Sequence, residues 1–243
     1  MGSLENQLEE EFANLKISGA NQKYVRHYLG LIQGKDTPTY EHSARLAILG
    51  ARAAECLGPA IDPKTMFFAG ALHDIGKIAI EEEILQKTEG FNAEDMKKME
   101  AHPIISYLLL ERIDPCSAEI ALRHHHHQEN GYPSDEEIER LSKLTNGEKV
   151  KIEFYSLIFS LLDVYDAATT RKNDKHNGDV LTPEEARLML IDKNPEMEKE
   201  INTLYDGGVL GNGNIILPNS IVAAPARDDL VTSIASMVNG TPQ

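Results

Sequence analysis

The sequence has 243 residues, of which 41% are hydrophobic and 26% are charged, and its formal net charge is −15. This length suits one large domain, or a core domain with small appendages. The strong negative charge repels nucleic-acid backbones, so we expect no nucleic-acid polymer as a partner. A small phosphate-containing substrate stays compatible with the charge, because bound divalent cations can reverse the local potential.

No part of the sequence approaches the ~18 to 20 consecutive apolar residues that a membrane span requires, so we expect no membrane partner. The first ten residues, MGSLENQLEE, are acidic and lack the basic start and apolar segment of a secretory signal. With only two cysteines in the chain, these features predict a cytoplasmic protein. The sequence permits a homodimer without predicting one.

The N-terminal region, residues 1–36, is expected to form a helical appendage, either a solvated helix or a partner-binding element. After it, apolar residues recur at helical spacing and strand-like alternation is nearly absent, which predicts an all-α bundle over residues 37–206. A loop-rich tail is expected over 207–243, with a short β-hairpin around 209–217.

Capping residues that precede a proline indicate where helices of the bundle begin. These pairs are Thr37-Pro38, Asp62-Pro63, Asp114-Pro115 and Thr182-Pro183. The pattern predicts helices at roughly 38–57, 63–74, 92–100, 103–113, 115–127, 151–170, 183–192 and 195–205, with a further short helix at about 135–144.

Several histidines occupy positions of these helices whose neighbours on the same face are apolar. They are His42, His73, His102 and His125, and Asp74 directly follows His73. Asp163 lies in the middle of an otherwise apolar helix, YSLIFSLLDVYDAATT, where an unpaired carboxylate would be costly. A shared metal cluster explains both the inward histidines and the buried aspartate. Imidazole and carboxylate ligands suit manganese, iron, zinc, nickel or cobalt better than magnesium or calcium.

Four motifs carry a resemblance to a known family. LHDIGK (72–77), AHP (101–103), the histidine run followed by GYP (131–133), and LLDVYDAATTRK (161–172) resemble the HD-GYP branch of the HD phosphohydrolases. The similarity extends from about Tyr40 to Tyr205. It implies a helical bundle with a bi- or trinuclear metal site that hydrolyses cyclic di-GMP through a hydroxide bridging the metals.

The resemblance also implies roles for individual residues. The implied metal ligands are His42, His73, Asp74, His102, one or both of His124 and His125, and Asp163. Asp74 would bridge the ions and act in catalysis together with Lys77, which would contact the phosphate or its bridging water. Arg171 and Tyr132 are expected to bind substrate. The expected cofactor is a pair of divalent transition-metal ions, iron or manganese in preference to nickel, cobalt or zinc.

Three departures from the family pattern qualify this expectation. Pro38 stands where trinuclear members carry a glutamate, which favours a binuclear site. The segment HHHHQENGYP is one residue shorter than the family's equivalent, so a shift of the ligand pair to His126 and His127 stays open. About ten extra residues, SDEEIERLSK, enlarge the loop after GYP, which borders the substrate cleft in the family.

The favoured function is therefore a phosphodiesterase acting on a cyclic dinucleotide such as cyclic di-GMP. The alternatives are an HD phosphohydrolase of another nucleotide or small phosphate ester, a diiron oxygenase, and a non-catalytic nucleotide receptor. Lys77 and Arg171 also have a simpler interpretation as cations that complement helix ends. Asp166 is expected either to support a ligand histidine or to be a solvated carboxylate.

Overall fold

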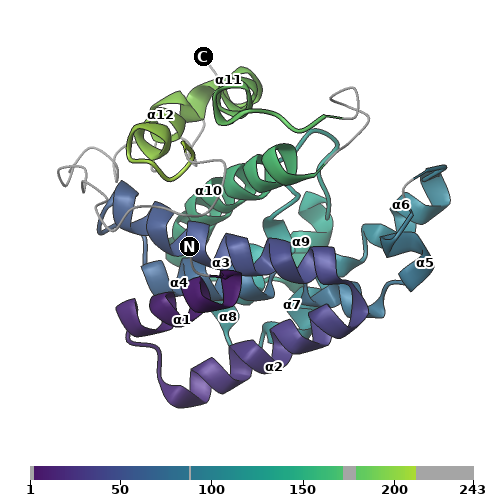
Figure 1. The fold of residues 1–243 in the computed structure, drawn as a ribbon. Coiled ribbons are helices and arrows are strands. Elements are labelled where there is room, and N and C mark those ends of the chain that lie inside the picture. The colour runs from purple at the N-terminus through teal and green to yellow at the C-terminus, as the bar shows by residue number, and fades with distance from the viewer. Residues whose placement is uncertain (1–2, 88, 172–178, 212–243) are drawn as a thin grey trace.

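A computed structural model of the chain describes residues 3–87, 89–171 and 179–211 (Figure 1). In these ranges all regular elements are helices, which confirms the all-α prediction. They are α1 (Leu4–Asn14), α2 (Gly19–Lys35), α3 (Thr37–Leu57), α4 (Pro63–Leu72), η1 (Ile75–Ala79), α5 (Glu82–Leu85), α6 (Ala93–Met99), α7 (His102–Leu110), α8 (Pro115–Arg123), α9 (Asp135–Leu141), α10 (Asn146–Thr170), α11 (Pro183–Lys193), η3 (Pro195–Met197) and α12 (Glu198–Asp206). The expected hairpin falls largely on residues 212–217, outside the described ranges.

Side-chain caps begin the helices much as the sequence predicted. Asp62, Asp114 and Thr182 cap α4, α8 and α11, each by accepting a hydrogen bond from a backbone N–H three residues later. For α3 the predicted cap is wrong: Asp36 accepts from the Thr39 N–H at 2.9 Å, and Thr37 is already helical. Asp36 is the cap in place of Thr37, because a carboxylate is favoured at the positive end of the helix dipole.

Helix α3 lies between two hydrophobic cores and is buried on both sides. Leu46 and Leu49 join a core with α10, α11 and α12, whereas Ala47 and Ile48 join a core with α1, α2, α7 and α8. Figure 1 displays this layering, with α11 and α12 on one side of α3 and α10, and with α1 and α2 on the other. No helix in the described part of the chain is long and apolar enough to cross a bilayer.

The first two helices are part of the second core. Phe12, Val25, Leu29 and Ile32 are each at most 3% exposed, and Glu11 forms a buried ion pair with Arg52 of α3 at 2.8 Å. The expectation of a solvated N-terminal helix is therefore wrong, because burial of these apolar side chains stabilises the docked position.

A close approach of α3 and α4 brings the first potential ligands together. A Cβ at Gly70 would lie 2.3 Å from the backbone carbonyl of Leu46, so only glycine permits this contact. The approach holds the end of α4 against α3, and it thereby sets His73 and Asp74 beside His42.

Several predicted helix boundaries are wrong by two to five residues. Helix α4 ends at Leu72 rather than 74, α8 ends at Arg123 rather than 127, and α10 begins at Asn146 rather than 151. The early start of α10 follows from Glu148, whose carboxylate accepts a hydrogen bond from the Thr145 N–H at 2.9 Å. Helices α4 and α8 end early where His73 and His124 follow them, and both histidines lie in the functional site.

Candidate metal centre

The seven potential ligands implied by the sequence converge from five helices. They are His42 on α3, His73 and Asp74 after α4, His102 at the start of α7, His124 and His125 after α8, and Asp163 on α10. All except His125 are classed with the buried residues, and the side chain of His125 is 16% exposed. Groups separated by up to 121 positions therefore share one interior site.

Asp74 occupies the middle of this cluster. Its Oδ1 lies 3.2 Å from His102 Nε2 and 3.9 Å from His124 Nε2. Its Oδ2 lies 3.3 Å from His73 Nε2 and 4.0 Å from His42 Nε2. Each oxygen thus faces a different pair of histidines, which is the arrangement that a carboxylate bridging two ions requires.

Three of the histidines are oriented by the same local interaction. The Nδ1 atoms of His73, His102 and His124 contact backbone carbonyls three residues earlier, at 3.0, 2.7 and 2.7 Å. In each case the carbonyl belongs to the last turn of a helix and has no further partner within it. The imidazole takes the place of the next helical N–H, which explains why α4 and α8 end earlier than their apolar pattern predicts.

This interaction fixes the tautomer of the rings. A neutral histidine that donates from Nδ1 carries a lone pair on Nε2. His102 Nε2 and His124 Nε2 are 3.2 Å apart, so two lone pairs face each other with no proton between them. His73 Nε2 and Asp74 Oδ1 are also buried without a hydrogen-bond partner among the described residues.

Such a set of orphaned acceptors fits a metal centre. Buried acceptors without partners are destabilising unless a cation satisfies them. Two nitrogens that bind one ion at about 2.1 Å each lie roughly 3 Å apart, close to the separation of the two Nε2 atoms. The donor set of imidazoles and carboxylates suits divalent transition metals.

The protonation states agree with metal binding. Burial, together with the neighbouring His125 and His73, holds the pKa of His124 well below its usual value. Burial likewise lowers the pKa of His125 to about 3. Burial acts to raise the pKa of Asp74, but interactions with the adjacent His73 and Lys77 outweigh it and hold that pKa well below its usual range. The centre therefore offers His124 and His125 as neutral imidazoles and Asp74 as an ionised carboxylate, the forms that bind metals. His42 differs: burial and Arg171 act to lower its pKa, but hydrogen bonds to Asp163 and Asp166 outweigh them and raise it.

His42 is held by a second carboxylate behind it. Its Nδ1 lies 2.7 Å from Asp166 Oδ2, and its Nε2 lies 3.0 Å from Asp163 Oδ1. Arg45 in turn donates to Asp166 from Nε at 2.7 Å and from Nη2 at 2.9 Å. Asp166 is thus a buried partner of a potential ligand, as one of its two interpretations from the sequence stated. The contribution of Arg45 was not predicted.

The ligating atoms form two groups that could each hold an ion. His42, His73 and Asp74 make one, and His102, His124 and His125 make the other. Within each group the atoms lie within 4.8 Å of one another. Asp163 is near both groups, because its Oδ1 lies 3.0 Å from His42 Nε2 and its Oδ2 lies 3.7 Å from His125 Nδ1. Gln128, which the sequence did not indicate, donates a hydrogen bond to the same Oδ2 at 3.3 Å.

Three further residues were predicted to act on substrate, and all lie beside the centre. Lys77 Nζ is 2.7 Å from Asp74 Oδ2. Arg171 follows the last turn of α10, and its Nη2 atom is buried without a partner in the described ranges. The ring of Tyr132 packs on the ring of His125, with centroids 4.8 Å apart.

The four consecutive histidines point to different places. His124 and His125 belong to the cluster, whereas His126 Nδ1 lies 2.9 Å from the Pro133 carbonyl and His127 Nε2 lies 3.5 Å from Glu153. The geometry therefore favours the first pair as ligands over the shifted pair.

The GYP turn closes tightly on this histidine run. A Cβ at Gly131 would lie 2.0 Å from the His126 carbonyl oxygen, so this position requires glycine. Asn130 adopts φ 58°, a left-handed conformation that asparagine tolerates better than most residues. These two residues allow the shortened segment to turn back and set Tyr132 on His125.

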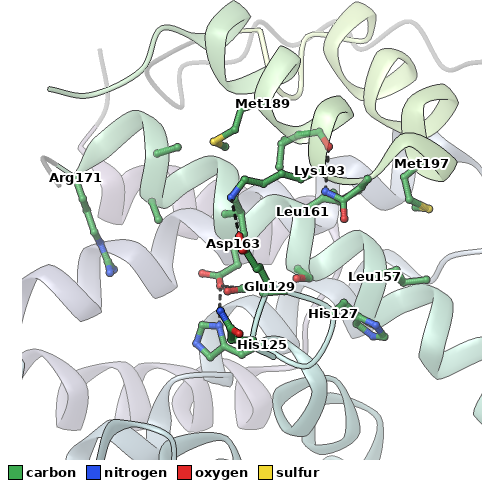
Figure 2. A pocket seen from close by; sticks show the side chains of 18 of the residues that line it. His125, His127, Glu129, Leu157, Leu161, Asp163, Arg171, Met189, Lys193 and Met197 are labelled. Atoms are coloured by element: carbon green, nitrogen blue, oxygen red, sulfur yellow. Dashed lines mark hydrogen bonds and ion pairs between the residues drawn. The ribbon is translucent and has the colours of Figure 1, made fainter. Parts of the chain in front are cut away.

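A cavity of about 1110 Å³ opens from the centre. Figure 2 shows Asp163 and His125 in its middle, Arg171 towards one end, and His127, Leu157 and Met197 towards the other. The ten residues after GYP do not line it: Ser134 to Lys143 contain α9, whose Ile138 packs into the core with α7 and α8. The expectation that this insertion borders the cleft is therefore wrong here.

Comparison with known proteins places the chain in a family. The model of the family described as HD domain matches residues 39–193, a range that contains every potential ligand. The chain belongs to the HD domain family. A Thermotoga maritima relative named cyclic di-GMP phosphodiesterase is 30% identical to this HD protein over 196 residues, 72% of the chain and 49% of the relative.

Other relatives carry related names. The Xanthomonas campestris cyclic di-GMP phosphodiesterase response regulator RpfG is 32% identical over 142 residues, 56% of this chain and 35% of the regulator. A Vibrio cholerae protein named 3′3′-cGAMP-specific phosphodiesterase 2 is 28% identical over 177 residues, 70% of this chain and 31% of that protein. The HD protein thus spans half or less of the length of these relatives.

Proposed function

We propose that this chain is a metal-dependent phosphodiesterase that hydrolyses a cyclic dinucleotide such as cyclic di-GMP. The observation that carries the proposal is the pair of ligand groups that meet at Asp74, in which His73 Nε2, Asp74 Oδ1 and His125 Nδ1 are buried without a hydrogen-bond partner among the described residues. The names of the relatives support the choice of substrate, since they include phosphodiesterases of cyclic di-GMP and of 3′3′-cGAMP.

We assign two divalent transition-metal ions to the centre, with iron or manganese as the preferred metals. Mixed imidazole and carboxylate ligands favour these metals over magnesium and calcium. When bound, the ions supply Lewis acidity and lower the pKa of a water molecule toward neutrality. Asp74 and Asp163 contribute the negative charge that holds them.

The remaining residues act directly on the substrate. Lys77 is 13% exposed beside Asp74, so its ammonium can donate to a phosphate oxygen at the centre. Arg171 lines the cavity with an unpartnered guanidinium nitrogen and can donate to the same phosphate from the other side. Together the two cations stabilise the negative charge that develops in the transition state.

The decisive experiment replaces Asp74. We expect Asp74→Ala to lose bound metal and to reduce turnover of cyclic dinucleotides by about 1,000-fold or more. Metal content is measured by plasma mass spectrometry, and turnover is measured with cyclic di-GMP, 3′3′-cGAMP and the linear dinucleotide. Asp192→Ala, which removes an exposed carboxylate from α11, is the matched control. Unchanged metal content and activity in Asp74→Ala would contradict the proposal.

A further inference from the structure

One stripe of helix α10 forms the floor of the cavity. Its residues are Leu157, Leu161, Val164 and Ala168, at steps of four, three and four, and Arg171 follows the end of the helix. At 1.5 Å per residue the stripe is about 16 Å long, and Asp163 lies near its middle. The cavity therefore continues past the metal centre on both sides, toward Arg171 and toward Leu157.

The part toward Leu157 is different in character from the centre. Leu157 and Leu161 of α10 and Met197 of η3 line it with apolar side chains, and His127 lies at the same end (Figure 2). On the side of this part that faces the centre, Lys193, the last residue of α11, lies 3.9 Å from Glu129 of the segment before GYP. We name this part, defined by these six residues, the α10–α11 wing (Figure 2).

The charge of the wing is unsuited to a second phosphate. Lys193 and Glu129 cancel, and Leu157, Leu161 and Met197 give a phosphate oxygen no hydrogen bond. His127 faces Glu153, at 3.5 Å. A flat heteroaromatic base fits both features, because apolar side chains pack on its faces while polar groups meet its edge. Leu157 is about 9 Å from Asp163 along the helix, which is comparable to the reach from the phosphate to the base of one nucleotide.

We propose that the α10–α11 wing binds a guanine base of the substrate, with Glu129 and Lys193 reading its edge. Guanine offers two adjacent donors, N1–H and the N2 amino group, to the two carboxylate oxygens of Glu129. Its O6 acceptor lies next to N1 and is available to the Lys193 ammonium. This inference rests on the proposed function, since it takes the phosphate of the same nucleotide to lie at the metal centre.

Adenine fits the same pair less well. It presents one amino donor beside one ring acceptor, so the carboxylate loses one of its two hydrogen bonds. Insertion of either base between Lys193 and Glu129 costs little free energy, because their ion pair is long and the two side chains are 50% and 83% exposed. Discrimination therefore comes from the number of hydrogen bonds that each base makes to Glu129, not from the opening of the pair.

The test compares the two bases in one variant. Glu129→Gln keeps the shape of the side chain but replaces one acceptor by a donor. We expect the ratio of kcat/KM for cyclic di-GMP to that for cyclic di-AMP to fall by about tenfold or more, with the change mainly in KM for cyclic di-GMP. Glu136→Gln, at an exposed position of α9 away from the cavity, should keep the wild-type ratio.

Failure of this inference can be distinguished from failure of the proposed function. If the wild-type protein shows no guanine preference, or if Glu129→Gln retains it, the wing does not read guanine although the enzyme hydrolyses cyclic dinucleotides. If the wild-type protein hydrolyses none of cyclic di-GMP, cyclic di-AMP and 3′3′-cGAMP, the proposed function fails. Calorimetric titration with GMP and AMP then tests the wing alone: a GMP preference that Glu129→Gln abolishes supports it, and equal affinities overturn it.

Discussion

The metal centre and the α10–α11 wing hold their polar groups in opposite ways. At the centre Asp74 and His124 are at most 1% exposed, and a hydrogen bond at Nδ1 orients each of the rings of His42, His73, His102 and His124. At the wing Glu129 and Lys193 are 83% and 50% exposed, and the ion pair between them is long, at 3.9 Å. The centre is therefore ordered before any substrate arrives, whereas the wing can adjust to what it binds. We therefore expect the chemistry and the choice of substrate to depend on separate parts of one cavity.

The largest effect should come from adding metal to the metal-stripped protein. The orphaned lone pairs of His73, His102 and His124 destabilise the folded state until an ion satisfies them. At 100 times the dissociation constant, a metal that binds only the folded state adds about 2.7 kcal/mol of stability, which should raise Tm by roughly 5–10 °C. Differential scanning calorimetry with manganese or ferrous iron measures the shift.

Asp74→Ala and a magnesium titration are the controls for this effect. The variant should show little shift with manganese, and the wild-type protein should show little shift with magnesium, which is poorly matched to histidine ligands. Equal shifts with manganese in the variant and the wild type would contradict the role given to Asp74.

The sequence predicted the class of fold because local chemistry determines it. Asp62, Asp114 and Thr182 cap helices as expected, since a capping side chain satisfies N–H groups of its own helix. The burial of α1 and α2 was missed, although Leu8, Phe12 and Leu15, and again Val25, Leu29 and Ile32, follow helical spacing. Their spacing indicates an apolar face, which a solvated helix would lack.

The motifs identified the potential ligands, but they could not predict the orientation of the imidazole rings. Helix ends at His73 and His124 depend on an imidazole that displaces the next backbone N–H, a choice made by the tertiary site. Arg45 and Gln128 are distant in sequence from the carboxylates that they contact. No local pattern marks such residues, so they became visible only in the folded chain.

The second prediction concerns Asp166, which supports the centre from outside. Asp166→Ala should weaken metal binding by about 10- to 100-fold, because His42 loses the partner that fixes its ring. Asp166→Asn should restore part of the affinity, since its amide oxygen still accepts from His42 Nδ1. Competition with a chelating dye measures the affinities, and Asp192→Ala is the control. An affinity of Asp166→Ala equal to that of the control would show that Asp166 does not position His42.

The third prediction concerns the turn that joins the two regions. Gly131→Ala introduces a Cβ that must move the His126 carbonyl, from which it would lie 2.0 Å, and we expect a loss of about 1–3 kcal/mol of stability. Gly147→Ala is the matched control, because no atom lies within 4 Å of a Cβ there and alanine is the better helix former. Urea unfolding compares the two. A loss in the control as large as that in Gly131→Ala would remove the steric explanation.

The smallest effect is expected at the wing, and it sharpens the contrast with the centre. Glu129→Gln removes only an exposed ion pair, so it should change the free energy of unfolding by less than about 0.5 kcal/mol. Because Glu129 contacts none of the potential ligands, the rise in Tm caused by manganese should equal that of the wild type. Calorimetry of the variant with and without manganese checks both statements. A reduced metal-induced shift would mean that the wing and the centre are coupled, and the division between chemistry and substrate choice would then have to be abandoned.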